Sequence, residues 1–123
     1  MPRSRDSTPV SGDLARWDQP ARVLKVMSHP VRLLILDALA ETSLCVKSLN
    51  ALVPIPQPHL SQHMAALRKA HLVASHKDGA LRCYYVLRPT LVRGLILLLR
   101  KDHPVKVRDR AAVRQEARRN ASC

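Results

Sequence analysis

The sequence predicts a mainly α-helical fold with one small β-hairpin. Apolar residues recur at three- and four-residue steps in several segments of the chain, whose 123 residues are a length typical of one domain. Phe is absent, so the core must be built from Leu, Val, Ile, Ala and Met, which suits packed helices better than a β-sandwich. The step Asp78-Gly79 lies between two short strand-like runs, which indicates a hairpin.

The N-terminal third predicts a disordered arm followed by two helices. Residues 1–13 are rich in Pro, Ser and charge, which favours disorder. Apolar positions then recur over 14–27, but Pro20 interrupts them, so we expect either a broken helix or a short helix after an extended lead. Ser28 is the expected cap of the next helix, which has Pro30 in its first turn.

The middle of the chain predicts a pair of helices and then the hairpin. After a turn at 41–44, a short helix over 46–53 is separated by two prolines from a helix over 57–70. The hairpin follows over 72–87. Two closely joined helices followed by a hairpin with a charged tip are typical of a winged helix-turn-helix, whose second helix fits the major groove of DNA.

The last predicted helix, over 89–100, is apolar on most of its sides. In a protein of this size such a helix belongs either to the central core or to a subunit interface, so we expect a homodimer formed through the terminal helices. The folded domain is therefore expected over 14–100, with 101–123 as a basic tail that is partly helical after Val107.

The charge of the chain predicts a polyanionic partner. The formal net charge is +12, and residues 20–100 contain 11 Lys or Arg against three Asp or Glu, so most of the excess lies on the folded domain. This favours double-stranded DNA as the partner, with a non-specific nucleic-acid-binding protein as an alternative. The N-terminus has no apolar signal region, the longest apolar run is too short for a bilayer, and three widely spaced cysteines indicate a reducing compartment, so we expect a cytoplasmic protein.

Residues 24–99 resemble the ArsR/SmtB family of bacterial regulators. The resemblance rests on the stretch His29-Pro30-Val31-Arg32-Leu33-Leu34-Ile35-Leu36, on the ungapped run SLCVKSLNALVPIPQPHLSQHMAALRKAHLV from Ser43, and on Asp78-Gly79 followed by Cys83-Tyr84-Tyr85-Val86-Leu87. It implies a dimeric, sequence-specific DNA-binding regulator that acts as a repressor.

Three positions depart from the family pattern. Pro54 replaces the usual Gly of the turn, and Pro56 replaces the usual Ser, which leaves the following helix without a side-chain cap. His71 stands where a helix C-terminus usually has Gly, so we expect it in a left-handed conformation.

The candidate DNA contacts lie on the second helix of the pair and on the hairpin. The helix residues that present polar groups to a groove are Gln57, His59, Ser61, Gln62 and His63. His63 precedes the buried position Met64, so both a contact and a structural role remain open. Arg68 and Lys69, at the far end of the helix, are expected to contact phosphates or a neighbouring element. Lys77 and Arg82 of the hairpin are expected to contact phosphates or the minor groove.

The sensing sites of the family are largely missing from this chain. The thiolate site keeps Cys45, but Lys47 replaces its second cysteine, and 91–100 has no Asp, Glu, His or Cys for the zinc site of the last helix. We therefore expect no metal and no cofactor, and the effector is unknown. An arsenic- or thiol-responsive repressor that uses Cys45 remains an alternative. Cys83 is expected to be a packing residue, as Cys45 can be, and the three cysteines are expected to converge only through the tail of Cys123 or across subunits. A cysteine-dependent enzyme is not expected, because the chain has only three Gly and no nucleophile turn.

Overall fold

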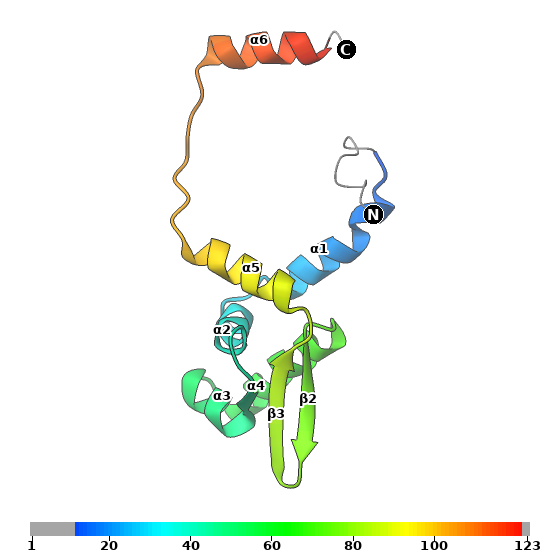
Figure 1. Cartoon of the computed structure of the whole chain (residues 1–123), viewed down its shortest axis with the longest axis vertical. Helices are drawn as coiled ribbons and strands as arrows, with labels where there is room; N and C mark the ends of the chain where they lie inside the picture. Colours follow the sequence, from blue (N-terminus) through cyan, green and yellow to red (C-terminus); the bar gives the residue numbers. More distant parts are fainter. Residues whose placement is uncertain (1–11, 122–123) are drawn as a thin grey trace.

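The computed structural model describes residues 12–121, and it shows a helical body with a three-stranded antiparallel sheet (Figure 1). Most of the expected arm over 1–13 lies outside the described residues, and so does Cys123. The elements in chain order are α1 (Ala15–Met27), α2 (Pro30–Leu39), β1 (Leu44–Cys45), α3 (Val46–Leu52), α4 (Gln57–Lys69), β2 (Val73–Asp78), β3 (Leu81–Val86), α5 (Pro89–Arg100) and α6 (Arg110–Ala121).

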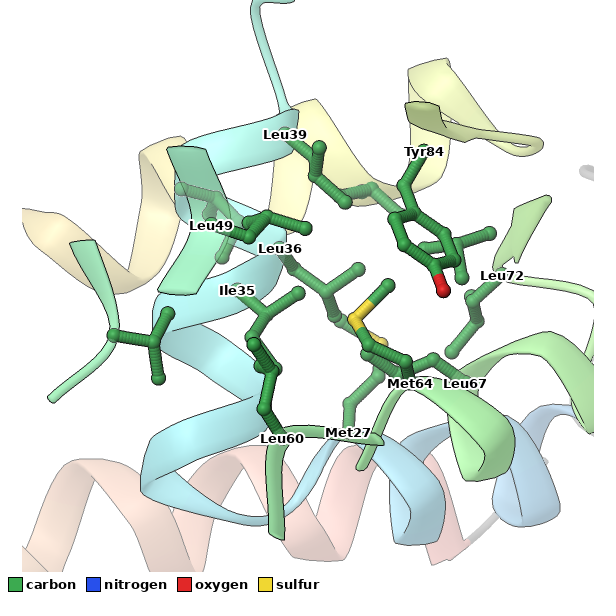
Figure 2. Packing of buried hydrophobic residues seen from close by; sticks show 14 of the residues in the cluster. Met27, Ile35, Leu36, Leu39, Leu49, Leu60, Met64, Leu67, Leu72 and Tyr84 are labelled. Carbon is green, nitrogen blue, oxygen red and sulfur yellow. The ribbon is translucent and has the colours of Figure 1, made fainter. Parts of the chain in front are cut away.

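The core is aliphatic and is centred on α2 (Figure 2). Among the described residues, no polar or charged side chain is buried. Tyr84 is the one aromatic side chain of this core, and it reaches in from β3. The largest fully buried side chains are Ile35, Leu36, Leu49, Val53, Leu67, Leu72, Val73 and Val92. The predicted helical core of Leu, Val, Ile and Met is thus confirmed.

Helix α1 corrects the expectation of a break at Pro20. The helix runs without interruption from Ala15 to Met27. Proline has no N–H to donate to the carbonyl of Arg16, but residues 12–22 are exposed, so the helix incurs no penalty of burial for the lost hydrogen bond. The buried residues of α1, Val23 and Met27, both lie after Pro20.

The start of α2 corrects the expected cap. His29, and not Ser28, is the N-cap, because its Nδ1 accepts a hydrogen bond of 3.1 Å from the backbone N–H of Val31. Ser28 is already the C-cap of α1, so only one residue separates it from the first helical residue, Pro30. Pro30 occupies the first turn as predicted.

The two ends of α4 confirm what the departures from the family pattern predicted. Pro56 is its N-cap and provides no side-chain hydrogen bond. At the other end, His71 has φ 58°. The N–H groups of His71 and Leu72 donate to the carbonyls of Arg68 and Leu67, both at 3.0 Å, which is a Schellman motif. Leu67 and Leu72 are both fully buried, so this apolar contact holds His71 in the left-handed conformation.

The sheet contains the predicted hairpin and one strand that was not predicted. β2 and β3 pair from Val73 with Val86 to Asp78 with Leu81, which leaves Gly79 and Ala80 as a two-residue loop. Gly79, with φ 62°, takes the first loop position, as a type II′ turn requires. β1 pairs with the other edge of β3, at a place where a turn was expected. The sequence did not predict this strand, because two residues are too few to show a sequence period.

The last two helices differ in their surroundings. α5 packs Val92 and Ile96 into the core and leaves several leucines exposed on its other side. α6 stands away from the body at the end of an irregular segment over 101–109 (Figure 1), which agrees with a tail that is partly helical after Val107. Arg108, in the irregular segment, forms an ion pair of 2.7 Å with Glu116 of α6. None of the helices in residues 12–121 has the length and apolarity that crossing a bilayer requires.

Candidate nucleic-acid interface

Helix α4 has one buried and one exposed side. Leu60, Met64 and Leu67 pack into the core. The exposed residues Pro58, Gln62, Ala65 and Lys69 are spaced by four, three and four positions, so they form one row on the side away from the core. Gln62 is the polar side chain at the centre of this row, where it is free to meet a ligand along the outer face.

The other predicted helix residues lie on the flanks of this row. Gln57 and Ser61 line a cleft of about 260 Å³ between α4, α3 and β3, together with Arg82 of the hairpin. His59 is exposed on the opposite flank. The predicted residues thus fall into three groups. Gln62 lies on the outer row, Gln57 and Ser61 face the hairpin, and His59 lies on the other flank.

His63 lies on the inner side of α4 and takes part in packing between helices. Its Nδ1 accepts a hydrogen bond of 3.1 Å from Nε of Arg32, and Arg32 also donates to the carbonyl of Val26 at 3.0 Å. The rings of His63 and His29 are 4.5 Å apart between centroids. Arg32 thus connects the end of α1 and the start of α2 to α4, and it holds the helix through His63.

The pKa of His63 reflects this position. Burial lowers its pKa below the ordinary value of 6.5, and the nearby His29, Arg32 and His59 lower it further. The hydrogen bond from Arg32 also requires Nδ1 to be unprotonated. His63 is therefore neutral where this contact is intact, and of the two roles left open by the sequence the structural one fits its position.

The hairpin places two like charges side by side. Lys77 of β2 and Arg82 of β3 are directly opposite each other in the register, and both are exposed. Like charges at directly opposed positions repel and destabilise a sheet, and an anion between them removes that cost. Only the pair Asp78 and Leu81 separates these two residues from the loop, which lies at the far end of the hairpin from α5 (Figure 1).

Two lysines lie near these residues, and one of them, Lys47, was not among the sequence-predicted contacts. Lys69 belongs to the outer row of α4, whereas the predicted Arg68 lies one position off it. Lys69 follows Gln62 by seven residues, a spacing that places both side chains on one face of the helix. Lys47 lies in the first turn of α3 and lines a groove of about 390 Å³ with Gln57 and Arg82. The groove depends on tertiary packing, so no local pattern indicated Lys47.

Cys45 is the N-cap residue of α3. Its pairing with Cys83 in β1 and β3 corrects the expectation that the cysteines converge only through the tail or across subunits. Its Sγ lies 3.2 Å from Oγ of Ser48. Hydrogen bonding by the Ser48 side chain, followed by that from its backbone, lowers the pKa of the Cys45 thiol below its ordinary value. Within residues 12–121, no group of three or more His, Cys, Asp or Glu side chains is arranged to hold a metal ion.

Helices α1 and α5 lie at the opposite end of the body from the hairpin tip (Figure 1). α1 and α5 form a groove of about 330 Å³, whose apolar lining residues are Pro20, Val23, Leu24, Leu91 and Leu95. Around it, Trp17 is 54% exposed, Leu24 55% and Leu98 54%. Exposed apolar side chains gathered in this way mark an interaction surface.

Comparisons with known proteins agree with this geometry. Residues 29–75, which span α2 to β2, match the family model described as bacterial regulatory protein, arsR family. The chain is 38% identical over 79 residues to the transcriptional activator HlyU of Vibrio cholerae, a match that covers 64% of this chain and 72% of HlyU.

Two solved structures share the fold. The transcriptional repressor BigR of Xylella fastidiosa superimposes with a TM-score of 0.67 at 26% identity, over 86% of this chain and 100% of that one. The homodimeric winged helix-turn-helix DNA-binding domain of a Mycobacterium bovis regulator gives a TM-score of 0.62 at 27% identity, over 76% and 87%. The predicted winged helix-turn-helix is thereby confirmed, and the chain is a member of the ArsR family of DNA-binding transcriptional regulators and not an enzyme.

Proposed function

We propose that this regulator binds a two-fold symmetric DNA site as a homodimer, with α4 in the major groove. The exposed row of α4 supports this proposal, because Gln62 stands at its centre and Lys69 at its end. A glutamine side chain pairs with adenine through two hydrogen bonds, which makes Gln62 the main base-reading residue. Lys69 then binds the phosphates that border the groove.

The hairpin acts as a wing that binds the backbone next to that groove. The opposed charges of Lys77 and Arg82 are relieved by a phosphate between them. Gln57 and Ser61 share a cleft with Arg82, so they meet the DNA where the helix and the wing come together. His59 and Arg68, both exposed on the flanks of α4, contribute phosphate contacts.

The homodimer forms through α1 and α5. The groove between these helices and the exposed Trp17, Leu24 and Leu98 provide an apolar surface on the side away from the wing tip. Pairing of two copies about a two-fold axis buries this surface twice and presents two α4 helices to one side of a duplex. The two half-sites then lie about one helical turn, or about 10 base pairs, apart.

We further propose that the dimer acts as a repressor. In this proposal the dimer represses by occupying a promoter site that polymerase needs. The related BigR is a repressor, whereas HlyU is an activator, so a promoter reporter decides the direction. Deletion of the gene is expected to raise expression from the bound promoter, and a fall would show activation.

Selection of binding sites from a random duplex pool tests the DNA-binding proposal. The full chain is incubated with the pool, and the bound duplexes are recovered over several rounds and sequenced. We expect a single motif with two-fold symmetry. Recovery of duplexes without a common motif, at an affinity equal to that for the starting pool, would instead identify a non-specific nucleic-acid-binding protein.

A further inference from the structure

Cys45 and Cys83 are far apart in the sequence but are directly opposed in the sheet. The antiparallel pairing of β1 with β3 sets Leu44 against Tyr84 and Cys45 against Cys83. Side chains at directly opposed positions project from the same face of a sheet, with Cβ atoms about 4.5–5.5 Å apart. The Cα separation of such a pair, about 4.5–5.5 Å, lies within the range that a disulfide spans. Its Cβ separation reaches the disulfide range of about 3.5–4.5 Å only at the short end, so closing the bridge draws the two strands slightly together.

The two thiols are free and accessible. Tyr84 points into the core, so the neighbouring Cys83 projects from the opposite face of β3. Both cysteines are partly exposed and neither is bonded in the described structure. A small oxidant in solution therefore has access to both sulfur atoms.

We propose that Cys45 and Cys83 form a redox-active pair that a peroxide converts to a disulfide within one protomer. The thiolate of Cys45 attacks one oxygen of hydrogen peroxide, and the O–O bond breaks to give the sulfenic acid and, after protonation, water. The thiol of Cys83 then attacks the sulfenic sulfur, which forms the S–S bond and releases a second water. Two thiols are oxidised and one peroxide is reduced to two waters.

Cys45 is the attacking residue because of its surroundings. The hydroxyl of Ser48, 3.2 Å from Sγ, stabilises the thiolate and lowers the pKa of Cys45. Cys83 is the resolving residue because the register holds it opposite Cys45. In the thiolate pattern of the family the second cysteine stands where this chain has Lys47. Cys83 of β3 supplies the second thiol instead.

The bridge joins the two parts of the molecule that the proposed function assigns to DNA. Cys45 precedes α3, the first helix of the helix-turn-helix, and Cys83 lies in the wing. In the part of the chain that the structure describes, the only strand pairing between the segment that leads into α3 and the wing is the two-residue pairing of β1 with β3. The disulfide makes this pairing covalent, and the proposal does not depend on which residues of α4 read bases.

Thiol mapping of a chain with the third cysteine removed tests the proposal. The Cys123→Ser protein is treated with hydrogen peroxide at a low protein concentration, which favours reaction within one molecule. It is then alkylated and analysed by mass spectrometry without reductant. We expect both thiols to be lost together, a mass lower by two hydrogen atoms, and one cross-linked peptide that contains Cys45 and Cys83. A reductant should restore both thiols.

The single variants provide the matched controls. In the same background, Cys83→Ser should stop at sulfenic acid on Cys45, detected with a dimedone-type probe, and Cys45→Ser should react more slowly at its remaining thiol. The proposal is overturned if the Cys123→Ser protein keeps both thiols under conditions that oxidise Cys45 in the Cys83→Ser variant. Disulfides found only between different molecules would also overturn it.

Discussion

Replacement of Leu98 by alanine should weaken the homodimer without unfolding the protomer. Leu98 is 54% exposed on α5 and lies three positions after Leu95, which lines the α1–α5 groove. Full burial of a leucine side chain contributes about 1.5–3 kcal/mol, so covering the exposed half contributes about 1 kcal/mol. Each substitution counts twice in a two-fold interface, which gives about 2 kcal/mol, or about a 30-fold higher dimer Kd.

Sedimentation over a range of protein concentrations measures this Kd directly. The matched control is Leu52→Ala at the end of α3, because Leu52 is 56% exposed but lies outside α1 and α5. Its dimer Kd should equal that of the unsubstituted protein. Equal dissociation constants for Leu98→Ala and Leu52→Ala, or a monomer at micromolar concentration before any substitution, would refute the assignment of the interface.

Three further predictions follow from the core, from the contact between α2 and α4, and from the wing. Leu67→Ala should lower the free energy of unfolding by about 2–5 kcal/mol, because Leu67 is fully buried and also closes the turn at His71; a loss below about 1 kcal/mol in urea denaturation would contradict this packing. Because the pKa of His63 is lowered in the folded state, the unfolded chain takes up the proton first, so the stability that neutral His63 contributes is present above pH 6.5 and is lost as the pH falls through the lowered value. His63→Gln, which keeps an acceptor for Arg32, should therefore flatten the fall in stability between about pH 7 and pH 5, and an unchanged slope would argue against it. Lys77→Ala should weaken binding to all duplexes alike and reduce the slope of log K against log salt by about one, whereas a loss confined to one sequence would show that Lys77 reads bases.

The sequence predicted most of the local features of this fold because their causes are local. The Asp78-Gly79 step predicted the place of the hairpin, and His71 was expected in a left-handed conformation because it stands at the helix C-terminal position that usually has Gly. The continuous α1 was not predicted, because the effect of Pro20 depends on whether the carbonyl of Arg16 reaches water. That exposure is a property of the tertiary structure.

The candidate interface was predicted in part for the same reason. The spacing of α4 places Gln62 on its outer row, but it does not show which elements cover the flanks. The role of His63 depends on Arg32, 31 positions earlier in the chain. The opposition of Cys45 and Cys83 depends on the two-residue strand β1, which no sequence period reveals.

The affinity of Gln62→Ala for two duplexes tests most directly whether α4 reads DNA bases. The variant is compared with the unsubstituted protein on the duplex recovered by selection and on a scrambled duplex of the same composition, at one salt concentration. Gln62 is exposed at the centre of the outer row, so its replacement should leave the fold intact, which circular dichroism checks. We predict a loss of about 1–3 kcal/mol on the selected duplex and almost none on the scrambled one. An equal loss on both duplexes would contradict base reading by α4.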